Sequence, residues 1–316
     1  MSASKFGTYD QIGQVEDISD IITNIAPTET PFQSMISKGK TKSMAPEWQE
    51  DDLDAPADNA HIQGNDAPAA NQVATTIRSN YVQQFIKTVQ VTDLARLIDT
   101  YGRDDELSYQ LSKKGKEVKR DLERALVGVD QAKVAGDMSS TARRMASVYQ
   151  LIDSSVTLSN SGTGRALTEE LWLDTLETLY NANGEATQVM IPPAHARRVA
   201  TFAYRDAGAS GYAPQRMREL SGDTRSITNV IDVYEGPHGK VEVRMNRWMK
   251  KYVQSSTNAE HLFFNPSNFK LVTLQPWTRE ELAKTGTSEK HLIKGAFTLM
   301  HANVKLSGRL SDLNNS

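Results

Sequence analysis

Residues 73–92 read VATTIRSNYVQQFIKTVQVT, and apolar and polar side chains alternate along this stretch. Six of the ten odd-numbered positions are apolar, whereas only three of the ten even-numbered positions are. A period of two predicts a β-strand with one buried face. A strand of this length would reach roughly 60 Å, far beyond the usual strand of about 5–6 residues. We therefore expect a projecting two-stranded arm covered by a partner surface, because an isolated hairpin is only marginally stable.

The second strand of this arm is expected at 42–49, and a long acidic loop, 50–72, separates the two strands. The loop reads EDDLDAPADNAHIQGNDAPAANQ, contains six acidic residues and shows no apolar period. Loops of this length are uncommon in compact domains unless they have a function. A cation could bind the acidic run, but the spacing and the closing Glu of a calcium loop are missing, which favours a solvated loop.

Residues 104–135 are predicted to form one helix, roughly 48 Å long. Acidic residues fill its first turn, 104–106, where the positive end of the helix dipole favours negative charge. One apolar stripe follows the helical period, and Gly115 on this stripe predicts close packing. The stripe consists of Leu107, Leu111, Val118, Leu122, Ala125, Leu126 and Val129.

The opposite face of this helix carries six Lys or Arg side chains within 113–124, interleaved with Glu117, Asp121 and Glu123. Two interpretations remain open. The first, which we favour, is an ordinary solvated face with pairs between residues four apart, such as Lys113 and Glu117. The second is a nucleic-acid contact made by the basic side chains.

The segments on either side of the arm and the helix predict an α+β protein. Residues 1–40 read as an extended arm with one or two amphipathic turns, interrupted at Pro27 and Pro31. Beyond the long helix, further helices and strands mix without a strict βαβ order. We expect helices at 169–182, capped by Thr168, and at 193–206. We expect strands at 186–191, 227–234, 240–245, 261–264, 269–274 and 291–306.

The composition excludes several classes of protein. The 316 residues carry a formal net charge of −3, and residues 1–100 alone carry −7, which argues against a nucleic-acid binder that works by charge alone. No apolar run reaches 18 residues, and the N-terminus lacks the apolar core of a secretory signal. The chain has no Cys, which removes disulfides and thiolate chemistry and is typical of a protein that folds in the cytosol.

Catalytic and metal-binding signatures are missing from the sequence, so we expect no enzyme, no cofactor and no metal site. The six His residues show neither HExxH nor HxxxH spacing, and we expect independent imidazoles on the surface or half-buried. Gly162 and Gly164 begin like a dinucleotide-binding loop, but Leu167 stands where the third Gly is required. Neither a phosphate-binding loop nor a nucleophile elbow occurs.

Many short segments, in a fixed order along almost the whole chain, carry a family resemblance. They are 26–32 (APTETPF), 47–49 (EWQ), 105–111 (DELSYQL), 113–117 (KKGKE), 119–123 (KRDLE), 234–236 (YEG) with Gly239, Val241 and Val243, 246–249 (NRWM), 282–286 (LAKTG) and 289–290 (EK). The sequence resembles the major capsid, or major head, proteins of tailed double-stranded-DNA bacteriophages. Within that group it is most similar to the head proteins of certain short-tailed phages.

The resemblance implies the HK97-like fold and a division of the chain into five parts. Residues 1–40 would be an N-terminal arm, 41–92 the extended E-loop, 93–149 the P domain with its spine helix, 150–260 the A domain and 261–316 the return to the P domain. The implied function is self-assembly, through an expanding procapsid, into an icosahedral or prolate head enclosing double-stranded DNA. The alternative is an oligomeric nucleic-acid-binding protein that uses the basic 113–124 face.

The resemblance also implies partners and contact surfaces. The chain would bind itself in hexamers and pentamers, a scaffolding protein, a portal and packaged double-stranded DNA without base readout, while a decoration protein is a further candidate and no membrane is involved. Assembly would occur in the host cytoplasm, and the product would be the capsid of the virion. Side chains expected between subunits are Phe32, Trp48, Ile77, Tyr81 and Phe85. Side chains expected to face DNA are Lys113, Lys114, Lys116, Arg120 and Arg124.

Overall fold

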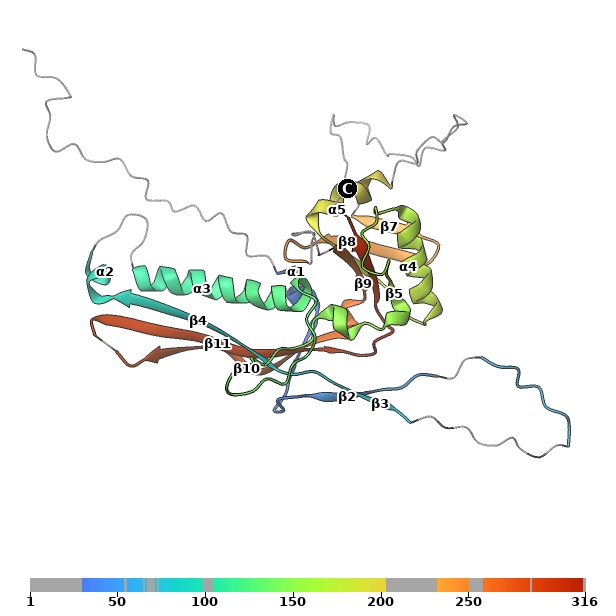
Figure 1. The fold of residues 1–316 in the computed structure, drawn as a ribbon, viewed down its shortest axis with the longest axis horizontal. Coiled ribbons are helices and arrows are strands. Elements are labelled where there is room, and N and C mark those ends of the chain that lie inside the picture. The colour runs from blue at the N-terminus through green and yellow to red at the C-terminus, as the bar shows by residue number, and fades with distance from the viewer. Residues whose placement is uncertain are drawn as a thin grey trace, which may run out of the picture.

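The computed structural model describes residues 30–314, apart from 54–55, 65, 67–71, 73, 99–104, 203–231, 250–257 and 285. The expected amphipathic turns before Pro27 lie outside the described residues, as do the ends of two expected elements at 203–206 and 227–231. Within the described ranges, two β-sheets, a long helix and a projecting hairpin form the subunit (Figure 1). The sequence-based assignment to the α+β class is confirmed.

The first sheet has four strands in the order β1-β10-β11-β4. The two long central strands, β10 (Phe269–Leu282) and β11 (Ser288–His301), are antiparallel neighbours. Strand β1 (Ser37–Lys40) pairs in parallel with β10, and β4 (Gln83–Thr92) pairs antiparallel with β11. Helix α3 (Glu106–Glu123) runs along β4 (Figure 1). The sheet and α3 bury their apolar faces against each other.

Strand β4 confirms the period-two pattern over half of its expected length. Phe85, Val89 and Val91 are buried, whereas the even-numbered positions between them are exposed. The 20-residue strand itself is corrected, because its first part forms the separate short strand β3 (Thr76–Ser79), and the chain passes through Asn80 before it enters the sheet as β4. The Asn80 amide is fully buried: its Nδ2 donates to Leu299 O (2.8 Å) and its Oδ1 accepts from Ala146 N (2.7 Å). These bonds fix the break between the sheet and the hairpin.

The hairpin therefore consists only of β3 and β2 (Glu47–Glu50), four residues each, with Trp48 opposite Arg78. The loop that joins these strands extends away from the body of the subunit (Figure 1). Its expected position as the tip of the arm is confirmed. Strand β4, which was expected to belong to the projecting arm, lies in the body instead.

Helix α3 begins at Glu106, two residues after the expected start, with Asp105 as its N-cap rather than in its first turn. The Asp105 side chain accepts hydrogen bonds from Leu107 N and Ser108 N, which caps the first turn. The helix ends much earlier than residue 135, because a π-helical turn, Arg124–Gly128, follows Glu123. The backbone oxygen of Trp248 lies 2.5 Å from where a Cβ on Gly128 would stand, so only Gly permits this approach. Gly115 has open space around it, so the prediction of close packing there was wrong.

The second sheet has six strands in the order β5-β12-β9-β6-β8-β7. Helices α4 (Glu169–Asn181) and α5 (Pro193–Thr201) belong to the same half of the molecule (Figure 1). Thr168 caps α4, as expected, by accepting from Leu171 N. The strands are β5 (Thr157–Leu158), β6 (Gln188–Ile191), β7 (Val233–Gly236), β8 (Gly239–Met245), β9 (Ala259–Phe264) and β12 (Gly308–Leu313).

The topology corrects the domain boundary expected at 260. Strand β12 lies in the six-stranded sheet between β5 and β9, although 261–316 was expected to return to the other domain as a whole. Leu310 and Leu313 are fully buried there, which places β12 in this core. Of the strands within 261–316, only β10 and β11 belong to the four-stranded sheet. The remaining short elements are α1 (Pro31–Met35), α2 (Asp93–Leu97) and 3-10 turns at Val148–Leu151, Ser154–Val156 and Pro266–Asn268.

Candidate assembly surface and buried junctions

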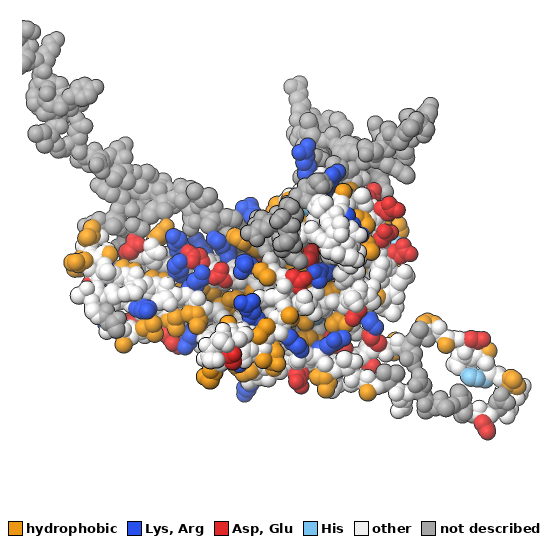
Figure 2. Space-filling model, viewed as in Figure 1, with side chains coloured by type: hydrophobic (Ala, Val, Ile, Leu, Met, Phe, Trp, Pro, Cys, Tyr) orange, Lys and Arg blue, Asp and Glu red, His pale blue; other side chains and the backbone are white. Residues whose placement is uncertain are grey.

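The hairpin is the surface with the clearest need for a partner. Ile77 on β3 is 62% exposed, and the loop beyond it carries Ile62 at 75% exposure. Figure 2 shows apolar and acidic side chains on the same projection, whose base is tied to the body where Lys305 and Asn303 bond Asp52. A two-stranded ribbon of this length has too little buried surface for stability alone. The structure thus retains the feature from which we expected an intersubunit contact.

Only part of the expected contact set lies on this surface. Phe32, Trp48 and Phe85 are buried in the core of the subunit itself, so their assignment to an interface is corrected. Tyr81 is half-buried and Ile77 is exposed. The correction has a simple physical reason. Alternation with a period of two predicts which side chains are buried, but it does not show whether their own subunit or a neighbouring subunit covers them.

Phe32 shows how the N-terminal segment is held in the subunit. Its ring packs against Phe264 and Phe269, with both centroid distances at 5.6 Å. Phe264 belongs to the six-stranded sheet and Phe269 to the four-stranded sheet, so Phe32 joins the two. From Pro31 onward, the arm expected at 1–40 therefore belongs to the folded subunit, with Phe32 and Ile36 in its core.

Glu123 is the residue that sequence reasoning interpreted most differently from the structure. It was assigned to the solvated face of the long helix, yet it is fully buried. Its Oε1 accepts from Phe32 N (2.8 Å) and from Asn246 Nδ2 (2.7 Å), and its Oε2 accepts from Gln33 N (3.1 Å). The surrounding run LERALV, 122–127, is the one signal that could have indicated burial, because four of its other five residues are apolar.

The Glu123 junction connects three segments that are distant in the sequence. The carboxylate, on the last residue of α3, accepts from two N–H groups in the first turn of α1 and holds Asn246 in the segment after β8. Two of the segments that carry the family resemblance, 26–32 and 246–249, meet at this carboxylate. Burial raises the pKa of Glu123, although its three hydrogen bonds act in the opposite direction.

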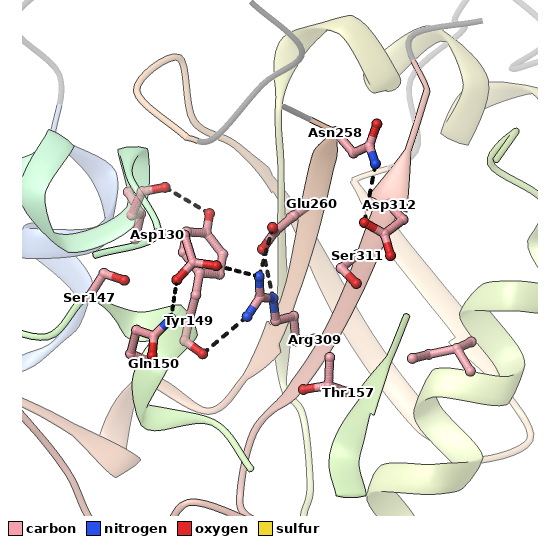
Figure 3. A network of polar contacts seen from close by, with 12 residues as sticks. Asp130, Ser147, Tyr149, Gln150, Thr157, Asn258, Glu260, Arg309, Ser311 and Asp312 are labelled. Carbon is pink, nitrogen blue, oxygen red and sulfur yellow. Dashed lines mark hydrogen bonds and ion pairs between the residues drawn. The ribbon is translucent and has the colours of Figure 1, made fainter. Parts of the chain in front are cut away.

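A second junction surrounds Arg309 on β12 (Figure 3). Its guanidinium forms two 2.8 Å bonds to the buried carboxylate of Glu260 and one 2.7 Å bond to Asp130. It also donates to Tyr149 O (3.3 Å) and lies over the Tyr149 ring. The junction thus connects β12 and β9 to the segment that follows α3. Its bidentate geometry is the arrangement in which Arg binds a carboxylate most strongly.

A third junction is a chain of neutral imidazoles, which corrects the expectation of independent His residues. Trp172 Nε1 donates to His261 Nδ1 (2.9 Å), so the proton of His261 is on Nε2, which faces His195 Nδ1 at 2.7 Å. His195 Nε2 then donates to Asn314 O (3.0 Å). Burial lowers the pKa of both imidazoles, that of His261 most strongly. The chain fastens the C-terminal end of β12 to α4, α5 and β9.

The charged face of α3 is only partly available. Lys113, Lys116 and Arg124 are exposed, whereas Lys114 Nζ bonds Glu117 at 2.7 Å and Arg120 lies over the Trp248 ring. Lys87 on β4 adds an ion pair to Asp121. The interleaved acids neutralise a large share of the positive charge. Of the helices in the described part, none is long and apolar enough to cross a membrane, and no group of three described His, Asp or Glu residues is arranged to hold a metal.

Comparisons with known proteins agree with this architecture. The family model of the SU10 major capsid protein matches residues 4–314. The major capsid protein of Escherichia phage Phieco32 is 31% identical over 350 residues, with 96% of each chain covered.

Similar solved structures include a protein of Mycobacterium phage Ogopogo (TM-score 0.63, 10% identity, 98% and 99% of the chains covered). The capsid of a native GTA particle is also similar (TM-score 0.61, 12% identity, 98% of this chain and 97% of that chain covered). So is the SrpI encapsulin of Synechococcus elongatus PCC 7942 (TM-score 0.59, 9% identity, 100% of this chain and 98% of that chain covered).

Two sheets, a spine helix and a projecting hairpin make up the HK97-like capsid fold. The chain belongs to the SU10 major capsid protein family. Its role is structural, as a subunit of the phage capsid, and the expected fold class and function are confirmed. The alternative of an oligomeric nucleic-acid-binding protein finds no support.

Proposed function

We propose that copies of this chain form hexamers and pentamers, which close into a phage head around double-stranded DNA. A scaffolding protein and a portal take part in assembly in the host cytoplasm, and a decoration protein is a further candidate partner. Family membership and the capsid architecture support this proposal. We also retain the functional division into an E-loop containing β2 and β3, a P domain around the four-stranded sheet and an A domain around the six-stranded sheet.

The exposed hairpin is the observation that carries the proposal. Ile77 lies at 62% exposure on a strand with a single neighbour, and the connecting loop projects into solvent (Figure 1). A neighbouring subunit that covers this ribbon would supply the burial that its own chain does not. Burying one such side chain contributes about 1.5–3 kcal/mol, and every subunit of a shell would repeat the contact.

The exposed basic residues of α3 and of the π-helical turn that follows it are proposed to face the packaged DNA. Lys113, Lys116 and Arg124 are the exposed members of the expected set, while Lys114 and Arg120 have partners within the subunit. Because Glu117 and Asp121 are interleaved, the attraction should be weak and should fall with salt. Phosphate contacts of this kind carry no base specificity.

Negative-stain electron microscopy of the purified protein, with and without the scaffolding protein, tests the proposal. We expect closed shells with the scaffold, and an Ile77→Ser variant should remain folded but form at least about tenfold fewer shells. Val233→Ser, at a second exposed apolar position on a strand of the A domain, is the matched control and should assemble normally. A wild-type chain that never forms shells would contradict the proposal.

A further inference from the structure

A lysine-rimmed apolar pocket lies at the edge of the four-stranded sheet. It has a volume of about 510 Å³ and is lined by Lys40, Thr41, Lys42, Thr273, Leu274 and Pro276. Leu274, Pro276 and the methyl groups of the threonines supply the apolar lining. The size falls within the range of about 300–1,000 Å³ that is typical of ligand pockets. The pocket therefore offers room for more than one side chain of a bound segment.

The rim of the pocket is positively charged. Lys40 and Lys42 are exposed, and in the part of the chain that the structure describes neither forms an ion pair. Lys40 and Lys42 therefore supply the two ammonium groups at the rim. Strand β1 is also the outer strand of its sheet. Lysines on an edge strand discourage uncontrolled pairing, but they also favour an acidic partner.

The hairpin loop has the complementary chemistry. Ile62 is 75% exposed, with Asp58 and Asp66 four residues away on either side, and no Lys or Arg occurs between 43 and 77. Asp58 Oδ1 accepts from Ala60 N (3.1 Å) and His61 contacts Asn59, which shapes the turn that presents Ile62. The loop extends away from the sheet that carries the pocket (Figures 1 and 2). A pocket on another subunit is therefore the natural receptor.

We propose that the acidic hairpin loop of one subunit docks into the lysine-rimmed pocket of a second copy of this chain. Ile62 enters the apolar part, and Asp58 and Asp66 meet the ammonium groups of Lys40 and Lys42. The inference rests on the proposed assembly into shells and names the receiving surface of the hairpin. Apolar contact at the centre with charged pairs at the rim is the usual organisation of a specific interface.

Cysteine pairs give the sharpest test, because the natural chain contains no Cys. Ile62→Cys combined with Leu274→Cys should give disulfide-linked multimers after oxidation of assembled shells, seen by electrophoresis without reductant. The unassembled subunit and each single variant should remain monomeric. Ile62→Cys with Ile86→Cys is the matched control, because Ile86 is a half-exposed residue of the same sheet outside the pocket. Shells without multimers, or with equal multimers in the control pair, would overturn the inference.

Charge exchange tests the rim independently. Lys40→Asp with Lys42→Asp should lower the yield of shells about tenfold or more, and adding Asp58→Lys with Asp66→Lys to the same chain should restore it. Lys240→Asp with Arg244→Asp makes the same change of net charge at two exposed positions on β8, outside both surfaces, and should leave the yield of shells unchanged. Denaturant unfolding of each variant confirms that the subunits are folded, and if the cysteine pair fails to fold, the charge series decides.

The two possible failures are distinguishable. If the wild-type chain forms no shells with its scaffold, the proposed function fails. If shells form but the exchanged chain is not rescued, the assignment of the pocket is wrong while the proposed function stands.

Discussion

Glu123 and Glu260 are both buried carboxylates at junctions within the subunit, yet their partners differ in kind. Glu260 faces the guanidinium of Arg309 through two bonds of 2.8 Å, whereas Glu123 accepts only from uncharged N–H groups. The positive charge at Glu260 compensates for lost hydration, but neutral donors at Glu123 do so only in part. The two junctions should therefore respond differently to mutation and to pH.

The largest effect is expected at the paired site. Arg309→Met leaves Glu260 and Asp130 without their shared cation, and the subunit should lose about 3–5 kcal/mol of unfolding free energy. Urea unfolding followed by tryptophan fluorescence measures this loss. Adding Glu260→Leu should recover part of it, because the uncompensated buried charge is then removed. Surface ion pairs contribute about 0–1 kcal/mol. If the unfolding free energy of Arg309→Met lies within about 1 kcal/mol of the wild-type value, the junction contributes no more to stability than such a pair.

The next largest effect is a pH-dependent loss of stability at a buried imidazole, which is neutral in the folded subunit. Burial lowers the pKa of His301 to about 4, although Nδ1 donates to Leu151 O. The unfolded chain binds a proton below about pH 6.5 and the folded chain does not, so stability must fall as the pH falls from 6.5 towards 4. The loss attributable to His301 is up to about 3 kcal/mol.

Urea unfolding at pH 7 and pH 4.5 checks this pH dependence. His301→Gln should be less stable at pH 7, but its stability should decline less between the two values. His195 and His261, whose pKa values are also lowered, contribute in the same direction and remain in both proteins. An equal decline in the wild type and the variant would exclude His301 as a source.

The contribution of Glu123 to the unfolding free energy should change with pH in the opposite direction to that of His301, and by a smaller amount. Because burial raises its pKa above 4.5, the folded chain binds the extra proton, and this contribution to stability grows as the pH falls through the raised pKa towards 4.5. Glu123→Gln removes this dependence and places an NH₂ group against Gln33 N–H. We expect a loss of about 1 kcal/mol at pH 7, and about 2 kcal/mol for Glu123→Ala, which leaves buried donors unpaired.

The measurement for Glu123 is the difference in unfolding free energy between the wild type and Glu123→Gln at pH 7 and at pH 5. The difference should widen at pH 5, since only the wild type gains from protonation. If the difference in unfolding free energy narrows at pH 5 instead, hydrogen bonding outweighs burial at this carboxylate. Glu123 would then be a well-compensated buried carboxylate, as Glu260 is.

Local features of the sequence predicted the parts of the fold that local forces decide. Thr168 caps α4, as its position before an acidic first turn indicates, the acidic run 104–106 marks the start of α3, and the alternation of 83–92 gives the buried face of β4. Asn80 separates β3 from β4 through partners 66 and 219 residues away, so no local pattern could show this break. The burial of Glu123 and the sheet position of β12 could not be predicted for the same reason, because their partners are distant segments of the chain.

The smallest effect is expected at a surface pair, which completes the comparison. Lys114 and Glu117 form a 2.7 Å bond, shorter than either bond between Arg309 and Glu260, but both side chains remain partly exposed. Water screens the pair and solvates each partner when the other is removed, so distance alone does not determine the contribution. Lys114→Gln keeps the helix propensity nearly constant and should cost no more than about 0.5 kcal/mol. Unfolding in 1 M salt should abolish the difference, because the pair is screened there. A loss above 1 kcal/mol that persists in salt would mean that burial is not what separates the strong junction from the weak one.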